Sequence, residues 1–282
     1  MTPLLVVDGD SLGHRAYHAM PPVKGSEGRP VGLLLGFANM LLATYAVVQP
    51  RAVLVCCDAR SPSYRHELLP GYQGQRPEFA PDLREQLDTL PELAEAFGFH
   101  AAKEEPWEAD DLLASAVSVE EAAGGSALVF TSDRDSFQLV SDRTSILMPG
   151  KPGDGPTRVG RAEVVERYGV EPDQVVDLIA LRGDPSDNIP GAKGVGPKTA
   201  SELLRRYGSL EGVIAAASEL TPRQRESIGG HADELRSYRE VATMRRDVAL
   251  PALPDRPFDP ERAAAWCLER GISGLAKRLS AA

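Results

Sequence analysis

The sequence predicts an α/β fold in which a mostly parallel central sheet is flanked by helices. Along the first half of the chain, short apolar runs alternate with longer segments of helical periodicity. Each run is apolar throughout, which is typical of strands buried on both faces, whereas half-exposed strands alternate with polar residues. Helix-length segments between strands are also what parallel crossover connections require. We therefore expect helices on both faces of the sheet.

The predicted elements follow one another closely, with one long exception. Strands are expected at residues 4–7, 52–57, 99–102 and 126–131, and helices at 31–48, 82–97 and after residue 108. The segment from residue 59 to about residue 82 is polar and rich in Arg, Pro, Gly and Tyr. It is too long for a plain connection, which indicates a functional loop or lid.

The texture of the chain changes after residue 148. A loop rich in Gly and Pro at 149–156 leads into patterns that are helical from residue 160 onward. We therefore expect an α/β core at residues 1–158 and a helical half at residues 159–282. A length of 282 residues suits either one large domain or a core with an appended module.

Composition places the chain among soluble globular proteins. Hydrophobic residues make up 42% and charged residues 26%. No apolar run is long enough to span a membrane, and the start lacks the basic flank of a signal peptide. Cys56, Cys57 and Cys267 have no metal-binding spacing, which fits a reducing compartment. We expect a cytoplasmic protein with no membrane segment.

Acidic residues follow the predicted strands at the point where each strand ends. Asp8, Asp58 and Asp133 follow three separate strands. Carboxyl ends of parallel strands meet at one edge of a sheet, where ligands bind. A single Asp in such a place is usually a turn residue or helix cap, but three favour one shared acidic site. A denser cluster follows a short fourth strand and consists of Glu108, Asp110 and Asp111.

The dense cluster can be explained in two ways. Acids in a first helical turn complement the helix dipole and cap its N–H groups. Two like charges about 4 Å apart, however, repel by roughly 4 kcal/mol at an effective dielectric of 20. The repulsion within the cluster is therefore small only if the side chains point apart into solvent or bind a shared cation. Acids at several matching strand ends favour the second explanation, a metal site.

The net charge of −10 by itself argues against a nucleic-acid-binding protein. If the acids of the expected metal site are set aside, however, the rest of the chain is close to neutral. Basic residues then stand out in three groups, namely Arg60, Arg65, Arg76 and Arg84; Lys193, Lys198, Arg205 and Arg206; and Arg223 and Arg225. We expect the last pair to lie on solvated faces.

A glycine-rich turn in the helical half predicts a phosphate-binding element. Gly191, Gly194 and Gly196 precede a helix that is expected to begin at Pro197. Free N–H groups at such a helix start bind phosphate, and Lys193 and Lys198 add positive charge. The pattern indicates a clamp on a nucleic-acid backbone without base specificity. Just before the turn, the chain supplies two more carboxylates, Asp184 and Asp187.

These motifs resemble the 5′-nuclease family, which includes flap endonucleases, phage 5′-exonucleases and the amino-terminal domain of bacterial DNA polymerase I. The motifs are VDG at 7–9 with RAYHA at 15–19, RHEL at 65–68, EADD at 108–111, DRD at 133–135 with QLV at 138–140, and GDPSDNIPG at 183–191. The resemblance extends from residue 4 to about residue 210. It implies a PIN-like core, a helical arch at about 59–95 and a helix–three-turn–helix at about 176–208. Since no polymerase segment follows, we expect a stand-alone bacterial form.

The resemblance implies a metal-dependent, structure-specific 5′ nuclease that acts as a 5′-flap endonuclease and 5′-3′ exonuclease during DNA replication and repair. Two Mg²⁺ or Mn²⁺ ions would be bound, and a third ion or water-bridged binding stays open. Asp8, Asp58, Glu108 and Asp110 would hold the first ion, with Asp111 and Asp133 nearby; Asp133, Asp135, Asp184 and Asp187 would hold the second. The helix–three-turn–helix is further expected to bind K⁺.

The resemblance also implies DNA contacts on substrates with 5′ flaps, nicks or free 5′ ends, made by a monomer. The catalytic arginines would be Arg65 and Arg76, and the DNA-binding residues Arg15, Tyr72, Lys193, Gly194, Gly196, Lys198 and Thr199. For each exposed Arg, phosphate contact and plain solvation stay open. Tyr72 either stacks on a base or packs against the protein.

The chain departs from the family pattern in the arch and beside the acids. Gln73 stands where the family has a lysine that positions the scissile phosphate, and only Arg76 persists nearby. Asp10 replaces a usual Ser, which adds acid to the site, and Ser132 replaces a usual Gly. A non-catalytic DNA-binding relative, a related ribonuclease and an acidic regulatory domain are the alternatives. Nine filled acidic positions argue against the first, and the glycine turn against the second. The placement of the acids at strand ends argues against the third.

Overall fold

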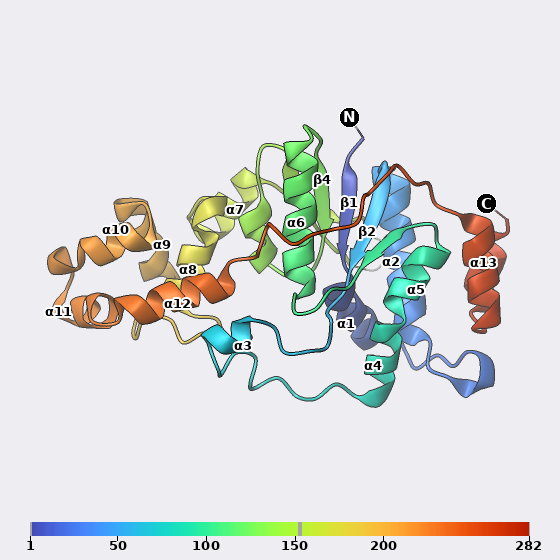
Figure 1. Cartoon of the computed structure of the whole chain (residues 1–282), viewed down its shortest axis with the longest axis horizontal. Helices are drawn as coiled ribbons and strands as arrows, with labels where there is room; N and C mark the ends of the chain where they lie inside the picture. The colour runs from blue at the N-terminus through green and yellow to red at the C-terminus, as the bar shows by residue number, and fades with distance from the viewer. Residues whose placement is uncertain (1, 152–153, 282) are drawn as a thin grey trace.

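The computed structural model describes residues 2–151 and 154–281 and is elongated, with a central sheet between two groups of helices (Figure 1). The sheet has six strands in the order β3-β2-β1-β4-β5-β6. The strands are β1 (Leu4–Asp8), β2 (Ala52–Cys56), β3 (His100–Ala102), β4 (Ala127–Phe130), β5 (Thr144–Met148) and β6 (Thr157–Val159). The first five are parallel, so the predicted α/β class with a mostly parallel sheet is confirmed.

Strand β6 was not predicted. It pairs antiparallel with β5 at the sheet edge, where Val159 lies opposite Ile146. Its first two residues are exposed, so it lacks the continuous apolar pattern of a buried strand. A three-residue edge strand after a loop rich in Gly and Pro leaves little periodicity to detect.

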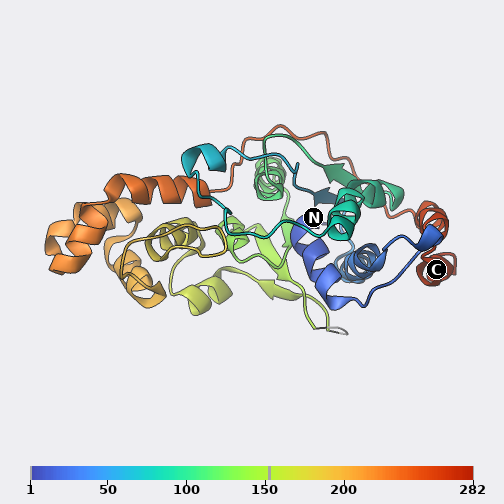
Figure 2. The same ribbon diagram turned by 90° about the horizontal axis from the view of Figure 1, so that it is seen from below.

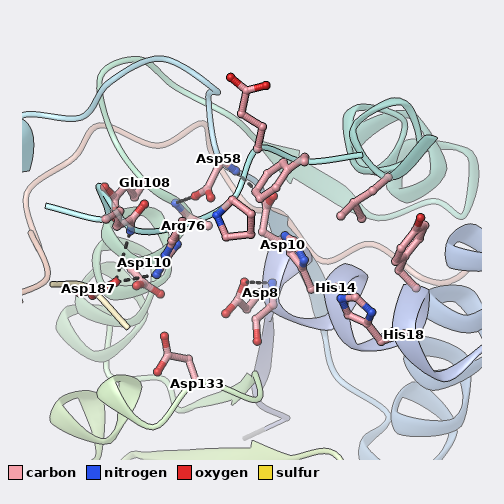
Figure 3. A pocket seen from close by; sticks show the side chains of 18 of the residues that line it. Asp8, Asp10, His14, His18, Asp58, Arg76, Glu108, Asp110, Asp133 and Asp187 are labelled. Atoms are coloured by element: carbon pink, nitrogen blue, oxygen red, sulfur yellow. Dashed lines mark hydrogen bonds and ion pairs between the residues drawn. The ribbon is translucent and has the colours of Figure 1, made fainter. Parts of the chain in front are cut away.

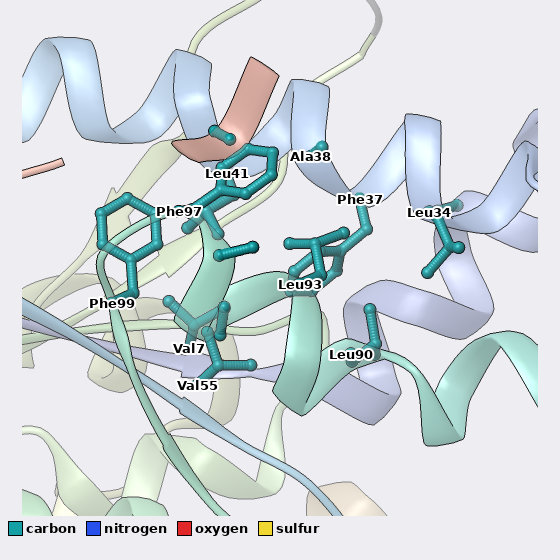
Figure 4. Packing of buried hydrophobic residues seen from close by; sticks show 14 of the residues in the cluster. Val7, Leu34, Phe37, Ala38, Leu41, Val55, Leu90, Leu93, Phe97 and Phe99 are labelled. Atoms are coloured by element: carbon teal, nitrogen blue, oxygen red, sulfur yellow. The ribbon is translucent and has the colours of Figure 1, made fainter. Parts of the chain in front are cut away.

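One face of the sheet carries the larger apolar core. Val7 and Val55 point from β1 and β2 into a cluster with Phe37, Phe97 and Phe99, all fully or almost fully buried (Figure 4). The helices on this face are α1 (Gly9–Ala19), α2 (Gly32–Val48), α4 (Pro81–Asp88), α5 (Leu90–Ala96), α13 (Pro260–Glu269) and α14 (Ser273–Leu279), with a short 3₁₀ turn at Ser26–Gly28. The predicted helix at 31–48 is confirmed as α2. The one expected at 82–97 is divided at Thr89, two residues before Pro91.

The opposite face of β1 is covered by α6 (Ala109–Ala122), against which Leu4 and Val6 pack. A long connection between α12 (Ala232–Ala242) and α13 crosses in front of α6 and the sheet (Figure 1). Met244 and Val248 from this connection are buried in the same cluster. Phe137 joins it from the short 3₁₀ helix η2 (Asp135–Leu139), so helices cover both faces as the sequence predicts.

The remaining helices form the other end of the molecule around a separate apolar cluster. They are α7 (Arg161–Tyr168), α8 (Val175–Arg182), α9 (Pro197–Tyr207), α10 (Leu210–Ala215), α11 (Pro222–Gln224) and α12 (Ala232–Ala242), with short helices at Pro172–Gln174, Ala217–Glu219 and Arg225–Gly229. The stretch 159–282 is not one spatial unit, because α13 and α14 belong to the apolar cluster at the far end of the molecule, where α13 contacts α5. No helix among the described residues is long and apolar enough to cross a membrane.

The polar segment after β2 joins the two ends of the molecule. It contains α3 (Arg65–Leu68), which lies beside α12, and then runs to α4 (Figure 2). Between β2 and α4, α3 is the one helix of this described stretch. The Gln73 N–H donates to the Asp187 carbonyl at 3.1 Å, and Asn188 Nδ2 donates to the Gly71 carbonyl at 2.6 Å. The segment is therefore attached to the loop that precedes α9.

Candidate metal centre and nucleic-acid interface

Carboxylates from separate elements line one pocket at the carboxyl edge of the sheet. The cavity has a volume of about 570 Å³. Its acidic residues are Glu78 and seven others labelled in Figure 3, namely Asp8, Asp10, Asp58, Glu108, Asp110, Asp133 and Asp187. Six of these were predicted as metal ligands. Among the described residues, Arg76 is the only Arg or Lys of the lining. The remaining wall comes mainly from α1 and the chain before α4, including His14, Tyr17, His18 and Phe79.

Backbone and hydroxyl hydrogen bonds hold the strand-end acids in place. Asp8 ends β1 and caps α1, since its Oδ1 accepts the Ser11 N–H at 3.0 Å and its Oδ2 accepts the Thr131 hydroxyl at 2.6 Å. The Oδ1 of Asp58 accepts the N–H of Ala109 at 2.8 Å, at the start of α6. Parallel pairing of β1 with β2 sets Asp8 opposite Cys56, two residues before Asp58. The acids therefore converge because the strands end in register.

Two further predicted ligands lie beside this pocket rather than in its lining. Asp135 follows Asp133 closely, and its N–H donates to Asp133 Oδ1 at 2.9 Å. The Oδ1 of Asp184 accepts the Ser186 N–H at 2.8 Å. Burial, followed by the charges of Asp133, Asp184 and Asp187, raises the pKa of Asp135 well above its usual value. The four acids therefore act on one another electrostatically.

The pocket disfavours a full set of carboxylate charges. Burial is the largest cause in each case and raises the pKa of Asp8 to about 8, that of Asp10 to about 7 and that of Asp187 to about 6. Neighbouring carboxylates add to the effect, while the Thr131 hydroxyl bond on Asp8 and Arg76 beside Asp187 oppose it. The pKa of Asp110 is raised well above its usual value by burial and then by Asp133 and Asp8. Crowded buried acids of this kind require protons or cations as partners.

The donor set fits hard divalent cations. The acidic side of the pocket offers carboxylate oxygens, which Mg²⁺ and Mn²⁺ prefer, and no thiolate. Within the described residues, no three His, Cys, Asp or Glu side chains are placed closely enough to hold one ion. Carboxylates such as those of Asp8, Asp58 and Asp187 instead accept hydrogen bonds from N–H groups, a hydroxyl or an arginine. The chemistry of the donors therefore fits, although side chains must turn to reach a shared ion.

The structure overturns two predicted roles at once, those of Asp111 and Arg65. Asp111 is fully buried, and both its oxygens accept from the Arg65 guanidinium at 2.7 Å. It also accepts the N–H groups of Arg245, at 2.8 Å, and Glu108, at 3.2 Å. Arg65 is only 3% exposed. Asp111 is therefore not turned to the pocket, and Arg65 is not available to a phosphate. They form a buried ion pair that joins α3, α6 and the chain after α12.

Residues of the predicted arch that lie near the pocket also form hydrogen bonds and an ion pair with neighbouring side chains. Tyr72 is 4% exposed and its hydroxyl donates to Glu108 Oε2 at 3.0 Å, so it packs and is not open to base stacking. Gln73, in place of the family lysine, donates from Nε2 to the Tyr72 hydroxyl at 2.9 Å. Arg76 Nη2 lies 2.6 Å from Asp187 Oδ1, and its side chain is 48% exposed. Of the two predicted catalytic arginines, Arg76 alone lines the pocket, whereas Arg65 approaches Glu108 Oε2 to 3.5 Å from behind the lining.

Asp10 does not add free acid to the site as expected. Its Oδ1 accepts from Arg60 Nη1 at 2.5 Å, and its Oδ2 accepts the Asp58 N–H at 2.7 Å. Sequence reasoning did not assign Arg60 to the site, since the pairing depends on how the loop after β2 folds back onto α1. Arg15 lies on α1 outside the pocket lining, and its Nη2 donates to the Gly150 carbonyl at 2.9 Å.

The glycine-rich turn has the predicted local structure. Gly191 and Gly194 have φ values of +68° and +81°, which side chains with a Cβ rarely adopt. Helix α9 begins at Pro197, directly after Gly196. Lys193, Gly194, Gly196 and Lys198 are exposed and Thr199 is half-buried. Arg223, which we expected on a solvated face, lies against the turn, because a Cβ on Gly194 would be 2.7 Å from its Nη2. No local sequence signal connects these two segments.

Two family models cover nearly the whole chain. The 5′-3′ exonuclease N-terminal resolvase-like domain matches residues 3–169, and the 5′-3′ exonuclease C-terminal SAM fold matches residues 170–262. The chain belongs to the 5′-3′ exonuclease family. The resemblance inferred from the motifs is therefore confirmed. The predicted domain limits and the roles of single residues stay predictions, except where the structure corrects them.

Relatives of this family member include bacterial DNA polymerases I. It is 38% identical over 259 residues to the thermostable enzyme of Thermus aquaticus, covering 92% of this chain and 30% of the polymerase. Identity to the Bacillus subtilis DNA polymerase I is 32% over 281 residues, or 98% of this chain and 32% of that protein. The chain thus spans less than a third of the length of these curated relatives.

Solved structures share the fold. T5 5′-exonuclease with bound divalent zinc ions has a TM-score of 0.72 at 22% identity, covering 85% of this chain and 89% of that one. The catalytic core of Rad2 in complex with DNA substrate has a TM-score of 0.60 at 16% identity, covering 98% and 92%. At these identities the likeness concerns the fold alone.

Proposed function

We propose that this chain is a metal-dependent, structure-specific 5′ nuclease that hydrolyses DNA phosphodiesters at 5′ flaps, nicks and free 5′ ends. The observation that carries the proposal is the convergence of carboxylates from several strand ends, the start of α6 and the loop before α9 on one pocket. Membership of the 5′-3′ exonuclease family supports it. So does the fold shared with the bacteriophage T5 flap endonuclease in its complex with DNA and metal ions, with a TM-score of 0.71 at 19% identity over 98% of this chain and 97% of that one.

Eight carboxylates would hold two Mg²⁺ or Mn²⁺ ions. Asp8, Asp58, Glu108 and Asp110 would take the first, and Asp133, Asp135, Asp184 and Asp187 the second. When bound, such ions supply Lewis-acid stabilisation of the phosphate and lower the pKa of water. The chain supplies fixed donors for this purpose, because Ser63 and Tyr72 each donate to Glu108, and Ala109 N–H holds Asp58.

Arg76 would be the residue that contacts the scissile phosphate. Its guanidinium rests on Asp187 at the pocket, yet its side chain is half-exposed and can turn to an incoming anion. A phosphate accepts two parallel N–H bonds from such a guanidinium. Gln73 carries no charge and is bonded to Tyr72. The positive charge that the family places at this position must therefore come from Arg76.

The turn at residues 191–199 would hold the backbone of the duplex. Lys193 and Lys198 place positive charge beside the start of α9, and Gly194, Gly196 and Thr199 let a phosphate approach the backbone N–H groups. A K⁺ ion at this turn is part of the proposal. Since one chain supplies every acid of the pocket, we propose that the enzyme acts as a monomer.

The proposal is tested by incubating a 5′-flap duplex with the protein in Mg²⁺, in Mn²⁺ and in chelator. We expect metal-dependent cutting near the flap junction that is lost in Asp133→Asn and retained in Asp173→Asn, an exposed acid of the helical half. Tight flap binding without cutting in either metal would instead identify a non-catalytic DNA-binding relative. The presence of Gln73 where the family has a lysine favours that alternative. Preferred cutting of a matched RNA strand would indicate a ribonuclease.

A further inference from the structure

The pairing of Asp10, in the pocket lining, with Arg60, behind it, has no role in the proposed function. Both residues are largely buried, with side chains 10% and 13% exposed. Asp10 uses one oxygen for Arg60 and the other for the Asp58 N–H. Asp10 therefore connects α1 to Asp58 and Arg60, which both belong to the loop after β2.

Arg60 is held where it could otherwise reach a second carboxylate. Its Nη1 lies 3.9 Å from Asp58 Oδ2, just outside hydrogen-bond distance. Its Nε donates to Asp88 at 3.2 Å, and the guanidinium lies 5.7 Å from the Phe79 ring centre. Within residues 2–151 and 154–281, Nη2 of Arg60 is the only buried side-chain nitrogen or oxygen without a hydrogen-bond partner. A short movement would bring the guanidinium onto Asp58.

Asp58 is suited to bind a cation only while Arg60, whose Nη1 forms a long ion pair with Asp58 Oδ2 at 3.9 Å, does not hydrogen-bond to it. Its Oδ1 already accepts the Ala109 N–H at 2.8 Å, so Oδ2 is the oxygen left for a ligand. A guanidinium forms its strongest hydrogen bonds with a carboxylate and can do so through two N–H groups. An Arg60 released from Asp10 would therefore compete with any cation at Asp58.

We propose that Asp10 is a positioning residue and not a metal ligand, because it fixes the main chain at Asp58 and keeps Arg60 off the Asp58 carboxylate. The inference rests on the proposed metal site. The competing explanation is that Asp10, which lines the pocket, binds an ion itself. The two explanations differ in what removal of Arg60 does once Asp10 has been neutralised.

A double-mutant cycle in metal-depleted protein tests this, with Mn²⁺ binding followed by titration calorimetry. We expect Asp10→Asn to weaken Mn²⁺ binding by about tenfold, as removal of an outer partner of a metal ligand commonly does. Arg60→Gln alone should change the dissociation constant by less than about threefold, since Arg60 is already engaged. The double variant should return to within about threefold of the wild type, because the competing guanidinium is gone.

Control variants separate positioning from charge and from stability. Arg60→Lys in the Asp10→Asn background retains a cation and should not restore binding. Arg76→Gln should change the Mn²⁺ affinity by the same factor with and without Asp10→Asn, since Arg76 contacts Asp187 and not Asp58. Arg51→Gln removes a partly buried pair with Glu120 just before β2, and should lower the melting temperature without weakening Mn²⁺ binding.

The outcomes are distinct. If Arg60→Gln has the same effect in both backgrounds, or if Asp10→Asn binds Mn²⁺ like the wild type, the positioning role is wrong. If Asp10→Asn is too unstable to titrate, Asp10→Ser removes the same carboxylate and must show the same dependence on Arg60. A wild-type protein that binds no Mn²⁺ would overturn the proposed metal site itself, and this inference with it.

Discussion

The strand-end pocket and the turn at 191–199 were both predicted as ligand sites, and they use their charges differently. In the pocket region most arginines are already paired, Arg60 with Asp10, Arg65 with Asp111 and Arg76 with Asp187. At the turn, Lys193, Lys198 and Arg223 are exposed. Ion pairs of the helical end within the described residues involve other cations, such as Arg206, Arg236 and Arg239. The cations at the turn are thus exposed to solvent, whereas most cations at the pocket already form ion pairs with carboxylates.

Burial accounts for the contrast. A charge that is removed from water must be paired or neutralised, whereas an exposed charge loses little when it has no partner. A substitution in the pocket region therefore disturbs a network of ion pairs and hydrogen bonds. Substitutions at two consecutive residues can then have quite different effects. A substitution at the turn should subtract one contact with DNA. The experiments below test this contrast in order of expected effect.

Asp110→Asn should give the largest loss of activity. Asp110 lines the pocket, and its pKa is strongly raised by burial and by Asp133 and Asp8. Loss of one preorganised electrostatic partner costs roughly 10²–10³-fold in rate. Flap cleavage at saturating DNA measures this effect, with flap binding in chelator as the control. The melting temperature without metal should be no lower than that of the wild type, because a disfavoured buried charge has been removed. An active Asp110→Asn would remove this residue from the ligand set.

Asp111→Asn, one residue further on, should act on stability instead. The substitution removes the carboxylate that Arg65 binds at 2.7 Å and leaves only Glu108, at 3.5 Å, as its charged neighbour. Breaking a buried pair costs about 3–5 kcal/mol of unfolding free energy. Urea denaturation measures the loss, and cleavage per folded molecule should change little. Arg65→Met combined with Asp111→Leu should recover much of the stability. If Asp111→Asn is stable but inactive, Asp111 acts as a metal ligand, as the sequence predicted.

The difference between Asp110 and Asp111 also marks what the sequence could not predict. Alternation of strands and helices placed the acids at one sheet edge, because parallel strands end together. Which acid of a helical first turn faces that edge depends on where the helix begins, and Glu108 proved to be the residue before α6. Arg60 and Arg223 were missed for a related reason, since their contacts join segments far apart in the chain. Tyr72 and Arg65 looked like DNA contacts until their burial was known.

The stability of the metal-free protein should fall as the pH rises, since the pKa values of Asp8, Asp10 and Asp187 are raised to about 8, 7 and 6. Above pH 4 the unfolded chain loses these protons while the folded chain retains them. Each further rise in pH up to the folded-state pKa values therefore lowers the free energy of unfolding. Thermal denaturation in chelator should therefore give a melting temperature that decreases from pH 5 to pH 8. Mn²⁺ should reverse the trend by replacing the protons. A flat or rising melting temperature in chelator would contradict the shared protonation of the pocket.

The smallest effects are expected at the turn, where each cation contributes one contact. Replacing Lys198 or Arg223 with Gln should lower the slope of log binding constant against log salt by about 0.9, the value for one phosphate contact. The cleavage rate at saturating DNA should not change, because these residues lie outside the pocket lining. Arg262→Gln is the matched control, an exposed arginine on α13 at the opposite end of the molecule (Figure 1). Equal slopes for Arg223→Gln and Arg262→Gln would mean that the guanidinium beside Gly194 only covers the glycine. A reduced slope for both variants would make Lys198, in the first turn of α9, and Arg223, within α11, parts of one phosphate clamp.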